Sequence, residues 1–178
     1  MKITLVRHAE IIPEYVGKYY GHLDMPLSDH GHKQAKTLAK KLQNRDFDKI
    51  YCSDLQRAVQ TLKAFKFEEK IVYTRELREK SWGKHEGKSF QEIEASGIKY
   101  ENFEQWINAL DGESMEEYTQ GVKNYFYNTI RDSKAHNVLV ITHLGVIKTF
   151  MSLYENISLQ EAFNKKLNYT EYITLDFF

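Results

Sequence analysis

Two apolar runs, one near each end of the chain, stop abruptly at a histidine. Residues 3–8 read Ile-Thr-Leu-Val-Arg-His, and residues 137–143 read Asn-Val-Leu-Val-Ile-Thr-His. β-Branched and apolar residues in such runs suit strands that are covered on both faces. In an open α/β fold the carboxyl ends of parallel strands meet at one edge. The two runs therefore predict that His8 and His143 lie at the same edge of one sheet.

The first run ends in Arg7 and His8 side by side. Open α/β folds bind their ligands at this edge, so a guanidinium beside an imidazole indicates an anion site that contains a nucleophile. A third run, residues 49–53, leads to a helix expected near residue 55, with Arg57 in its first turn. Taken singly, each of these residues is also compatible with a solvated side chain at the end of a strand or on an exposed helix.

The whole chain alternates strands and helices. Strands are expected at 2–7, 48–52, 71–73, 137–142 and 172–178, the last at an edge. Helices are expected at 28–43, with Ser28 as N-cap, at 55–65, over most of 89–131 with breaks at Gly97 and Gly112, and at 145–154. Strands separated by helices predict βαβ units. The predicted fold class is therefore α/β, with three α/β/α layers around a mostly parallel sheet.

Residues from about 80 to 112 do not complete a βαβ unit. We expect them to form a helical insertion over the carboxyl edge of a single domain that spans residues 1–178. The aromatic residues of this segment are expected either to wall a pocket or to pack a small core of the insertion's own: Trp82, Phe90, Tyr100, Phe103 and Trp106.

Composition narrows the class of protein. Lys plus Arg and Asp plus Glu number 25 each, so the formal net charge is zero, which argues against a nucleic-acid or membrane-surface protein but not against a small anionic ligand. The single cysteine, Cys52, lies in a predicted strand and is expected to be a buried thiol. With no visible secretory signal and no apolar run of membrane-spanning length, the expected location is cytoplasmic.

Five segments, in order along almost the whole chain, resemble the histidine phosphatase superfamily, also called the phosphoglycerate mutase-like family. Each is a short motif, and their shared order and spacing make the resemblance specific. The segments are Leu5-Val6-Arg7-His8, residues 21–35, Ser53-Asp54-Leu55-Gln56-Arg57-Ala58, residues 77–87 and Thr142-His143-Leu144-Gly145-Val146. The resemblance implies a phosphoglycerate mutase-like fold.

The resemblance also implies roles for five residues. His8 would be the nucleophile that forms a phosphohistidine, with its other ring nitrogen donating to a backbone carbonyl. Arg7 and Arg57 would offer paired N–H donors to the phosphoryl oxygens, and His143, if protonated, would add another donor. Glu79 would protonate the leaving oxygen and later accept a proton from water.

The substrate is expected to be a small phosphate ester, turned over by a metal-independent phosphomonoesterase. Tyr19-Tyr20-Gly21-His22 with Asp24 and Pro26-Leu27 most resembles the α-ribazole phosphatases of cobalamin assembly, and Tyr20, Gly21 and Leu144 are expected to contact the substrate. No cofactor or metal is expected, because the arginines offset the charge and the histidines lack the spacing of a zinc site. We expect a monomer or homodimer.

Several positions depart from the family pattern. Ala9 replaces a glycine, and Ile11 and Glu14 stand where many relatives carry a hydroxyl residue and an asparagine that help to hold the phosphoryl group. Glu14 would repel phosphate, so we expect it to point away or to contact a cationic part of the substrate. Leu144 replaces a glycine, and Gly121 stands where an arginine is frequent.

Three alternative functions remain at this stage. A phosphoglycerate mutase usually has extra segments that close the site over the phosphoenzyme, and this chain is short for such closure. A poorly active phosphate-binding or signalling protein is supported by Ala9, Ile11 and Glu14. A protein phosphohistidine phosphatase is disfavoured by the Glu79 segment and the insertion, because such proteins tend to lack both.

Overall fold

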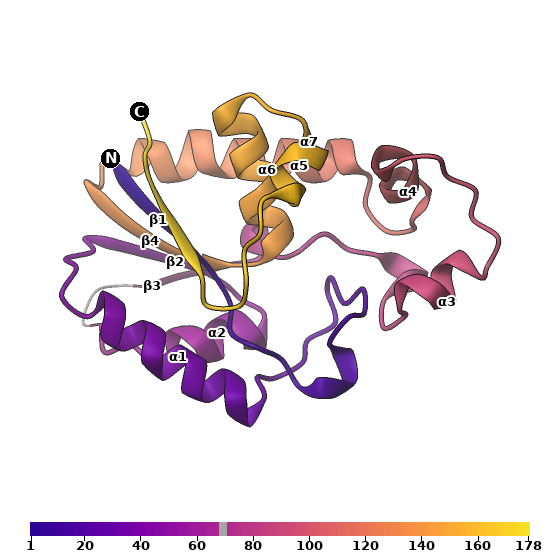
Figure 1. The fold of residues 1–178 in the computed structure, drawn as a ribbon. Helices are drawn as coiled ribbons and strands as arrows, with labels where there is room; N and C mark the ends of the chain where they lie inside the picture. Colours follow the sequence, from indigo (N-terminus) through magenta and orange to yellow (C-terminus); the bar gives the residue numbers. More distant parts are fainter. Residues whose placement is uncertain (68–70) are drawn as a thin grey trace.

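The protein is described here by a computed structural model, which covers residues 1–67 and 71–178. One five-stranded sheet forms its centre, in the order β3-β2-β4-β1-β5 (Figure 1). Strands β1 to β4 pair in parallel, as expected of a mostly parallel sheet, and β5 lies at an edge as predicted, where it runs antiparallel to β1. The strands are β1 Lys2–Arg7, β2 Lys49–Ser53, β3 Ile71–Thr74, β4 Asn137–Thr142 and β5 Tyr172–Asp176.

Strands β1 and β4 are neighbours in the middle of the sheet, and their apolar residues are fully buried. Their register pairs Lys2 with Asn137 and Arg7 with Thr142. The next residue of each strand therefore leaves the sheet at the same level, and the His8 N–H donates to the Thr142 carbonyl at 2.9 Å. The prediction that His8 and His143 share one edge is confirmed.

Helices cover both faces of the sheet, which confirms the three-layer architecture (Figure 1). Helix α1 begins after Ser28, whose side chain accepts from the Gly31 N–H as expected of an N-cap. Its apolar stripe packs with α2 on one face, and α5 and α6 pack on the other. The helices outside the 80–112 segment are α1 Asp29–Leu42, α2 Gln56–Leu62, α5 Met115–Asn124 with a π-helical extension Tyr125–Ile130, α6 Leu144–Glu155 and α7 Leu159–Asn164.

The segment from 80 to 112 holds α3 (Phe90–Glu94) and α4 (Phe103–Ala109), which lie beyond the carboxyl ends of the strands (Figure 1). Trp106 is buried at the centre of a small separate core, with the rings of Phe90 and Tyr100 at 4.7 and 4.8 Å from its own. The helical structure is interrupted around the two expected glycines, Gly97 and Gly112, which both adopt positive φ.

Two further expectations concern the cysteine and membrane-spanning segments. Cys52 is a buried free thiol, as predicted. In the part of the chain that the structure describes, no helix combines the length and apolar character needed to cross a membrane.

The aromatic packing beneath α6 predicts a large stability difference between two phenylalanines. Phe126 is fully buried and stacks on Phe150 with ring centroids 4.3 Å apart, whereas Phe178 is 89% exposed. Phe126→Ala should lower the free energy of unfolding by about 3–5 kcal/mol. Phe178→Ala should change it by less than about 0.5 kcal/mol. Urea denaturation checks both variants, and a loss below about 1 kcal/mol for Phe126→Ala would contradict this view of the core.

Candidate active site

His8 follows directly after β1 and is 1% exposed. Its Nδ1 lies 2.7 Å from the Ala9 carbonyl oxygen. Because a carbonyl can only accept, Nδ1 carries the hydrogen and Nε2 keeps its lone pair. Burial, and then the nearby Arg57 guanidinium, lower the pKa of His8 well below its usual value. The ring is therefore neutral at pH 7, and its bond to a backbone carbonyl is the one expected from the sequence.

Arg57 lies in the first turn of α2 and is fully buried. Its Nη1 and Nη2 donate to the carbonyls of Leu23 and Gly21 at 2.8 and 2.7 Å, and its Nε donates to His143 Nδ1 at 3.2 Å. The loop after β1 and the residue after β4 thus hold one guanidinium between them. This fixes Arg57 beside the two histidines.

His143 is buried next to His8, with ring centroids 5.1 Å apart. Arginine cannot accept a hydrogen bond, so His143 Nδ1 must be the acceptor of the bond from Arg57. The hydrogen is then on Nε2, which donates to Ser53 Oγ at 2.8 Å. Burial, and then Arg57, lower the pKa of His143 well below its usual value. In this state His143 is neutral and orients Arg57, rather than serving as the cationic donor considered from the sequence.

Arg7 ends β1, and its Nη1 donates to the Leu167 carbonyl at 2.7 Å. The guanidinium carbon lies 4.2 Å from the ring centre of Tyr169. Its Nε is buried and has no hydrogen-bond partner. A buried N–H without an acceptor is costly. Arg7 is therefore poised for an acceptor that the protein itself does not supply.

Two tyrosines cover these groups. The Tyr20 ring centre lies 5.1 Å from the guanidinium carbon of Arg57 and 6.4 Å from the ring of His8. Tyr169 lies 5.6 Å from His8 on another side, and the two tyrosine hydroxyls are 3.5 Å apart. Both rings lie near His8 and contribute to its burial.

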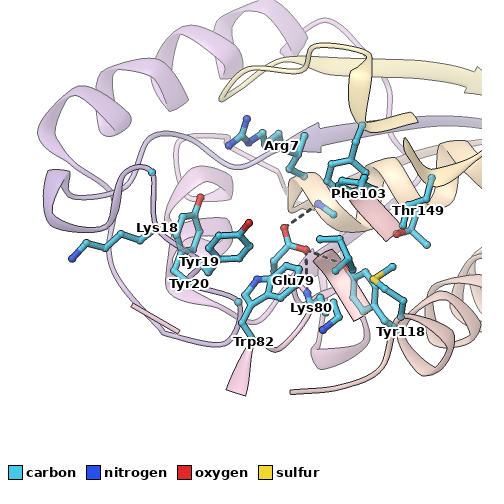
Figure 2. A pocket seen from close by; sticks show the side chains of 18 of the residues that line it. Arg7, Lys18, Tyr19, Tyr20, Glu79, Lys80, Trp82, Phe103, Tyr118 and Thr149 are labelled. Atoms are coloured by element: carbon cyan, nitrogen blue, oxygen red, sulfur yellow. Dashed lines mark hydrogen bonds between the residues drawn. The ribbon is translucent and has the colours of Figure 1, made fainter. Parts of the chain in front are cut away.

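The carboxylate of Glu79 accepts hydrogen bonds from three donors, and two of the donor residues, Lys80 and Tyr118, are labelled in Figure 2. Its Oε1 accepts from the Lys80 N–H at 3.0 Å and from the Tyr118 hydroxyl at 3.1 Å, and its Oε2 accepts from the Gly145 N–H at 2.9 Å. A Cβ at Gly145 would lie 2.0 Å from Glu79 Oε1. Only glycine lets the start of α6 approach the carboxylate this closely.

A cavity of about 360 Å³ opens beside Glu79. Figure 2 shows Tyr19, Tyr20 and Trp82 on one side of Glu79, with Tyr118 and Thr149 on the other. Four of the residues expected to bind substrate line it, whereas His8, Arg57 and His143 are buried and are not among the lining residues. The four that line it are Arg7, Tyr20, Gly21 and Leu144. Trp82 and Phe103 belong to the small core around Trp106 and also line this cavity, so both interpretations of the insertion's aromatic residues apply to them.

Two of the departures from the family pattern, Ala9 and Glu14, lie where they do not obstruct the site. Ala9 packs in a cluster with Leu27 and Ala35, and its N–H donates to Thr61 Oγ1 at 2.9 Å. Its methyl group is thus part of the packing against α1. Glu14 is exposed and is not part of the cavity wall, as expected for a carboxylate near an anion site.

Three residues around the site were not predicted from the sequence. Ser53 ends β2 at the edge where ligands bind, which is a signal that could have identified it. Tyr118 and Tyr169 come from α5 and from the loop before β5, and no motif marks either. Within residues 1–67 and 71–178, no three His, Cys, Asp or Glu side chains are grouped as a metal site would require.

Comparison with known proteins decides the family. Residues 3–178 match the model of the histidine phosphatase superfamily (branch 1). The chain belongs to this superfamily. Among curated relatives, the putative phosphoserine phosphatase 2 of Hydrogenobacter thermophilus is 30% identical over 172 residues, covering 92% of this chain and 83% of the relative. The adenosylcobalamin/alpha-ribazole phosphatase of Salmonella typhimurium is 30% identical over 161 residues, covering 85% and 78%.

Solved structures agree on the fold of this histidine phosphatase. The alpha-ribazole phosphatase from Shigella flexneri has a TM-score of 0.85 at 24% identity and covers 99% of this chain and 90% of its own. The phosphoglycerate mutase from Bacillus anthracis has a TM-score of 0.81 at 21% identity and covers 98% and 86%. The predicted phosphoglycerate mutase-like fold and the assignment to a phosphatase family are both confirmed.

The two neutral buried histidines predict a pH dependence of stability. In the unfolded chain, histidines take up protons below about pH 6.5, while His8 and His143 resist protonation in the folded state. The unfolded state then binds more protons, so the free energy of unfolding should fall as pH decreases from 7 to 5.5, by up to about 1.4 kcal/mol per pH unit for each histidine. Urea denaturation at several pH values measures the slope.

A matched pair of variants tests the source of this slope. His143→Asn should reduce the slope, whatever its effect on absolute stability. His32→Ala should leave it unchanged, because His32 is exposed on α1. A stability that is flat or rises toward pH 5.5 in the wild type would contradict the neutral assignment.

Proposed function

We propose that this chain is a metal-independent phosphomonoesterase that hydrolyses small phosphorylated metabolites through a phosphohistidine on His8. The observation that carries the proposal is the state of His8. Its ring is neutral, its Nδ1–H donates to the Ala9 carbonyl, and Nε2 keeps its lone pair, with Arg57 and Arg7 near enough to lower the pKa of the ring.

In the first step, His8 Nε2 attacks phosphorus in line as the bond to the leaving oxygen breaks. The ring gains positive charge, which the Ala9 carbonyl stabilises through Nδ1–H. Arg7 and Arg57 offset the charge spread over the phosphoryl oxygens. Most N–H groups of Arg57 already have protein acceptors, so the unpartnered Nε–H of Arg7 is the readier donor.

Glu79 donates its proton to the leaving oxygen in this step. Water then attacks the phosphohistidine, Glu79 takes a proton from that water, the N–P bond breaks, and inorganic phosphate leaves with His8 neutral again. Glu79 Oε1 already accepts from the Lys80 N–H and the Tyr118 hydroxyl, whereas Oε2 accepts only from the Gly145 N–H, so Oε2 is the oxygen with room to carry the proton that is transferred.

The finer assignment is α-ribazole 5'-phosphate as substrate. It is supported by the resemblance of Tyr19–Leu27 to that subfamily and by the relative from Salmonella typhimurium, which carries this activity in its name. Phosphoglycerate mutation remains the alternative, because a mutase shares the fold. A cytoplasmic location and a monomer or homodimer complete the proposal.

Hydrolysis of p-nitrophenyl phosphate with EDTA present tests the nucleophile and metal independence together. The wild type should be active and unaffected by EDTA, and His8→Ala should lose turnover, because no other group in the proposal attacks phosphorus. The matched control is His30→Ala, an exposed histidine that should keep its activity within about twofold. Melting temperatures check that each variant folds. Substantial activity in His8→Ala would refute the nucleophile, and inhibition by EDTA would refute metal independence.

The acid role of Glu79 predicts a dependence on the leaving group. Glu79→Gln should lower kcat for alkyl phosphates by about 10²–10⁴-fold. The same variant should lose far less on p-nitrophenyl phosphate, because nitrophenolate leaves without a proton. Glu76→Gln, an exposed residue three positions away, is the control and should change neither rate. Equal losses of Glu79→Gln on both substrates would remove Glu79 from the acid role.

A further inference from the structure

Lys148 is a buried lysine that the proposed mechanism does not use. It lies on α6 and is 2% exposed. Among the residues with described positions, no carboxylate forms an ion pair with its Nζ. Burial, and then the cationic side chains of Lys165 and Arg7, lower the pKa of Lys148. Lysine is rarely buried unless an acidic group pairs with it, so this side chain needs another explanation.

The hydrogen-bond partner of Lys148 Nζ is the backbone carbonyl of Lys165. Lys165 is the C-cap residue of α7, and the last carbonyls of a helix have no partner within that helix. A lysine side chain can satisfy such a carbonyl. Helices α6 and α7 pack side by side (Figure 1). The Lys148 side chain therefore joins α6 to the point at which the chain leaves α7.

The chain that follows this carbonyl leads to Arg7. Residues 165–171 connect α7 to β5 and belong to no helix or strand. Within this segment, the Leu167 carbonyl accepts from Arg7 Nη1 at 2.7 Å, and the Tyr169 ring centre lies 4.2 Å from the guanidinium carbon. The segment thus contacts the guanidinium twice, through a hydrogen bond and through an aromatic ring.

The far end of the segment is fixed to the backbone of β1. The Thr170 N–H donates to the Arg7 carbonyl at 3.1 Å, and the Arg7 N–H donates to the Glu171 carbonyl at 3.1 Å. Thr170 adopts a φ of 58°, which is rare for a β-branched residue. Such a conformation persists only where surrounding contacts impose it. Lys148 therefore holds one end of the segment, and the backbone of β1 holds the other.

The orientation of the Arg7 guanidinium depends on this segment. Its Nε is buried without a partner and is the readier donor to a phosphoryl group. Without the bond from Lys148, the start of the segment is free to shift, and Arg7 Nη1 then loses its acceptor at Leu167. A guanidinium that turns no longer presents its N–H groups in one direction, and catalysis is sensitive to displacements of about 1 Å.

We propose that Lys148 is a positioning residue that holds Arg7 in place through the Lys165 carbonyl and the segment that follows it. The inference rests on the proposed function and deepens it, because it names what fixes a phosphoryl-binding side chain from outside the site. The alternative is a purely structural role, in which Lys148 only joins α6 to α7 and affects stability alone.

The first experiment removes the donor. Lys148→Met keeps most of the side-chain volume but cannot donate, so kcat/KM for p-nitrophenyl phosphate should fall by about 10- to 100-fold at a temperature where the variant is folded. KM and the inhibition constant of inorganic phosphate should both rise, because Arg7 binds phosphoryl oxygens before the transition state as well as in it. Lys123→Met, an exposed lysine on α5, is the matched control and should change kcat/KM by less than about twofold.

The second experiment asks whether Lys148 acts through Arg7. Arg7→Ala alone should lower kcat by about 10²–10³-fold. Adding Lys148→Met to Arg7→Ala should cost no more than about a further twofold, because residues that act as one unit have non-additive effects. Calorimetric titration of inorganic phosphate into the same four proteins should show the same pattern without turnover. A full additional loss in the double variant would show that Lys148 acts independently of Arg7 and would overturn the proposal.

Two further variants separate the donor from the packing. Lys148→Arg keeps a cationic donor, so its kcat/KM should stay within about fivefold of the wild type. Lys148→Gln is too short to reach the same carbonyl and should lose about as much as Lys148→Met, which it replaces in both experiments if Lys148→Met does not fold. Equal losses in Lys148→Arg and Lys148→Met would overturn the role of the hydrogen bond.

Failure of this inference can be told apart from failure of the proposed function. Hydrolysis of p-nitrophenyl phosphate by the wild type, with Lys148→Met changing only the Tm, would refute this inference alone and establish the structural role. A wild type that neither hydrolyses esters nor binds inorganic phosphate would refute the proposed function and this inference together.

Discussion

The parallel pairing of β1 with β4 is the constraint on which the site depends. Because Arg7 is in register with Thr142, the next residue of each strand leaves the sheet at one level, and two imidazoles meet with their centres 5.1 Å apart. Arg57 enters from α2 and ties His143 to the loop at Gly21 and Leu23. A one-residue shift in that register would move the two imidazoles apart.

Burial determines the chemistry of these groups. His8, Arg57 and His143 are removed from water by the sheet behind them and by Tyr20 and Tyr169 in front. Desolvation disfavours charge on both imidazoles, which keeps a lone pair on His8 at neutral pH. The same burial keeps bulk solvent from the nucleophile.

The sequence predicted what local patterns encode. The apolar strand runs predicted the layers and the edge that His8 and His143 share. The Ser28 cap predicted the start of α1, and the motif predicted that Arg57 lies in the first turn of the next helix. It did not predict contacts that depend on packing between distant segments. Tyr118 meets Glu79 across 39 positions, and Ser53 meets His143 across 90. The protonation state of His143 was left open for the same reason, because the direction of its pKa shift depends on complete burial beside Arg57 and not on the motif itself.

The order of the strands in the sheet determines when β1 can pair with its neighbours during synthesis. Strand β1 is made first, yet its neighbours in the sheet are β4 and β5, which begin at Asn137 and Tyr172. Strand β1 therefore has no strand partner in this sheet until β4 has been made. Pairings between such distant segments form slowly. The strand that leads to the nucleophile is thus among the elements whose pairing depends on segments distant in the sequence.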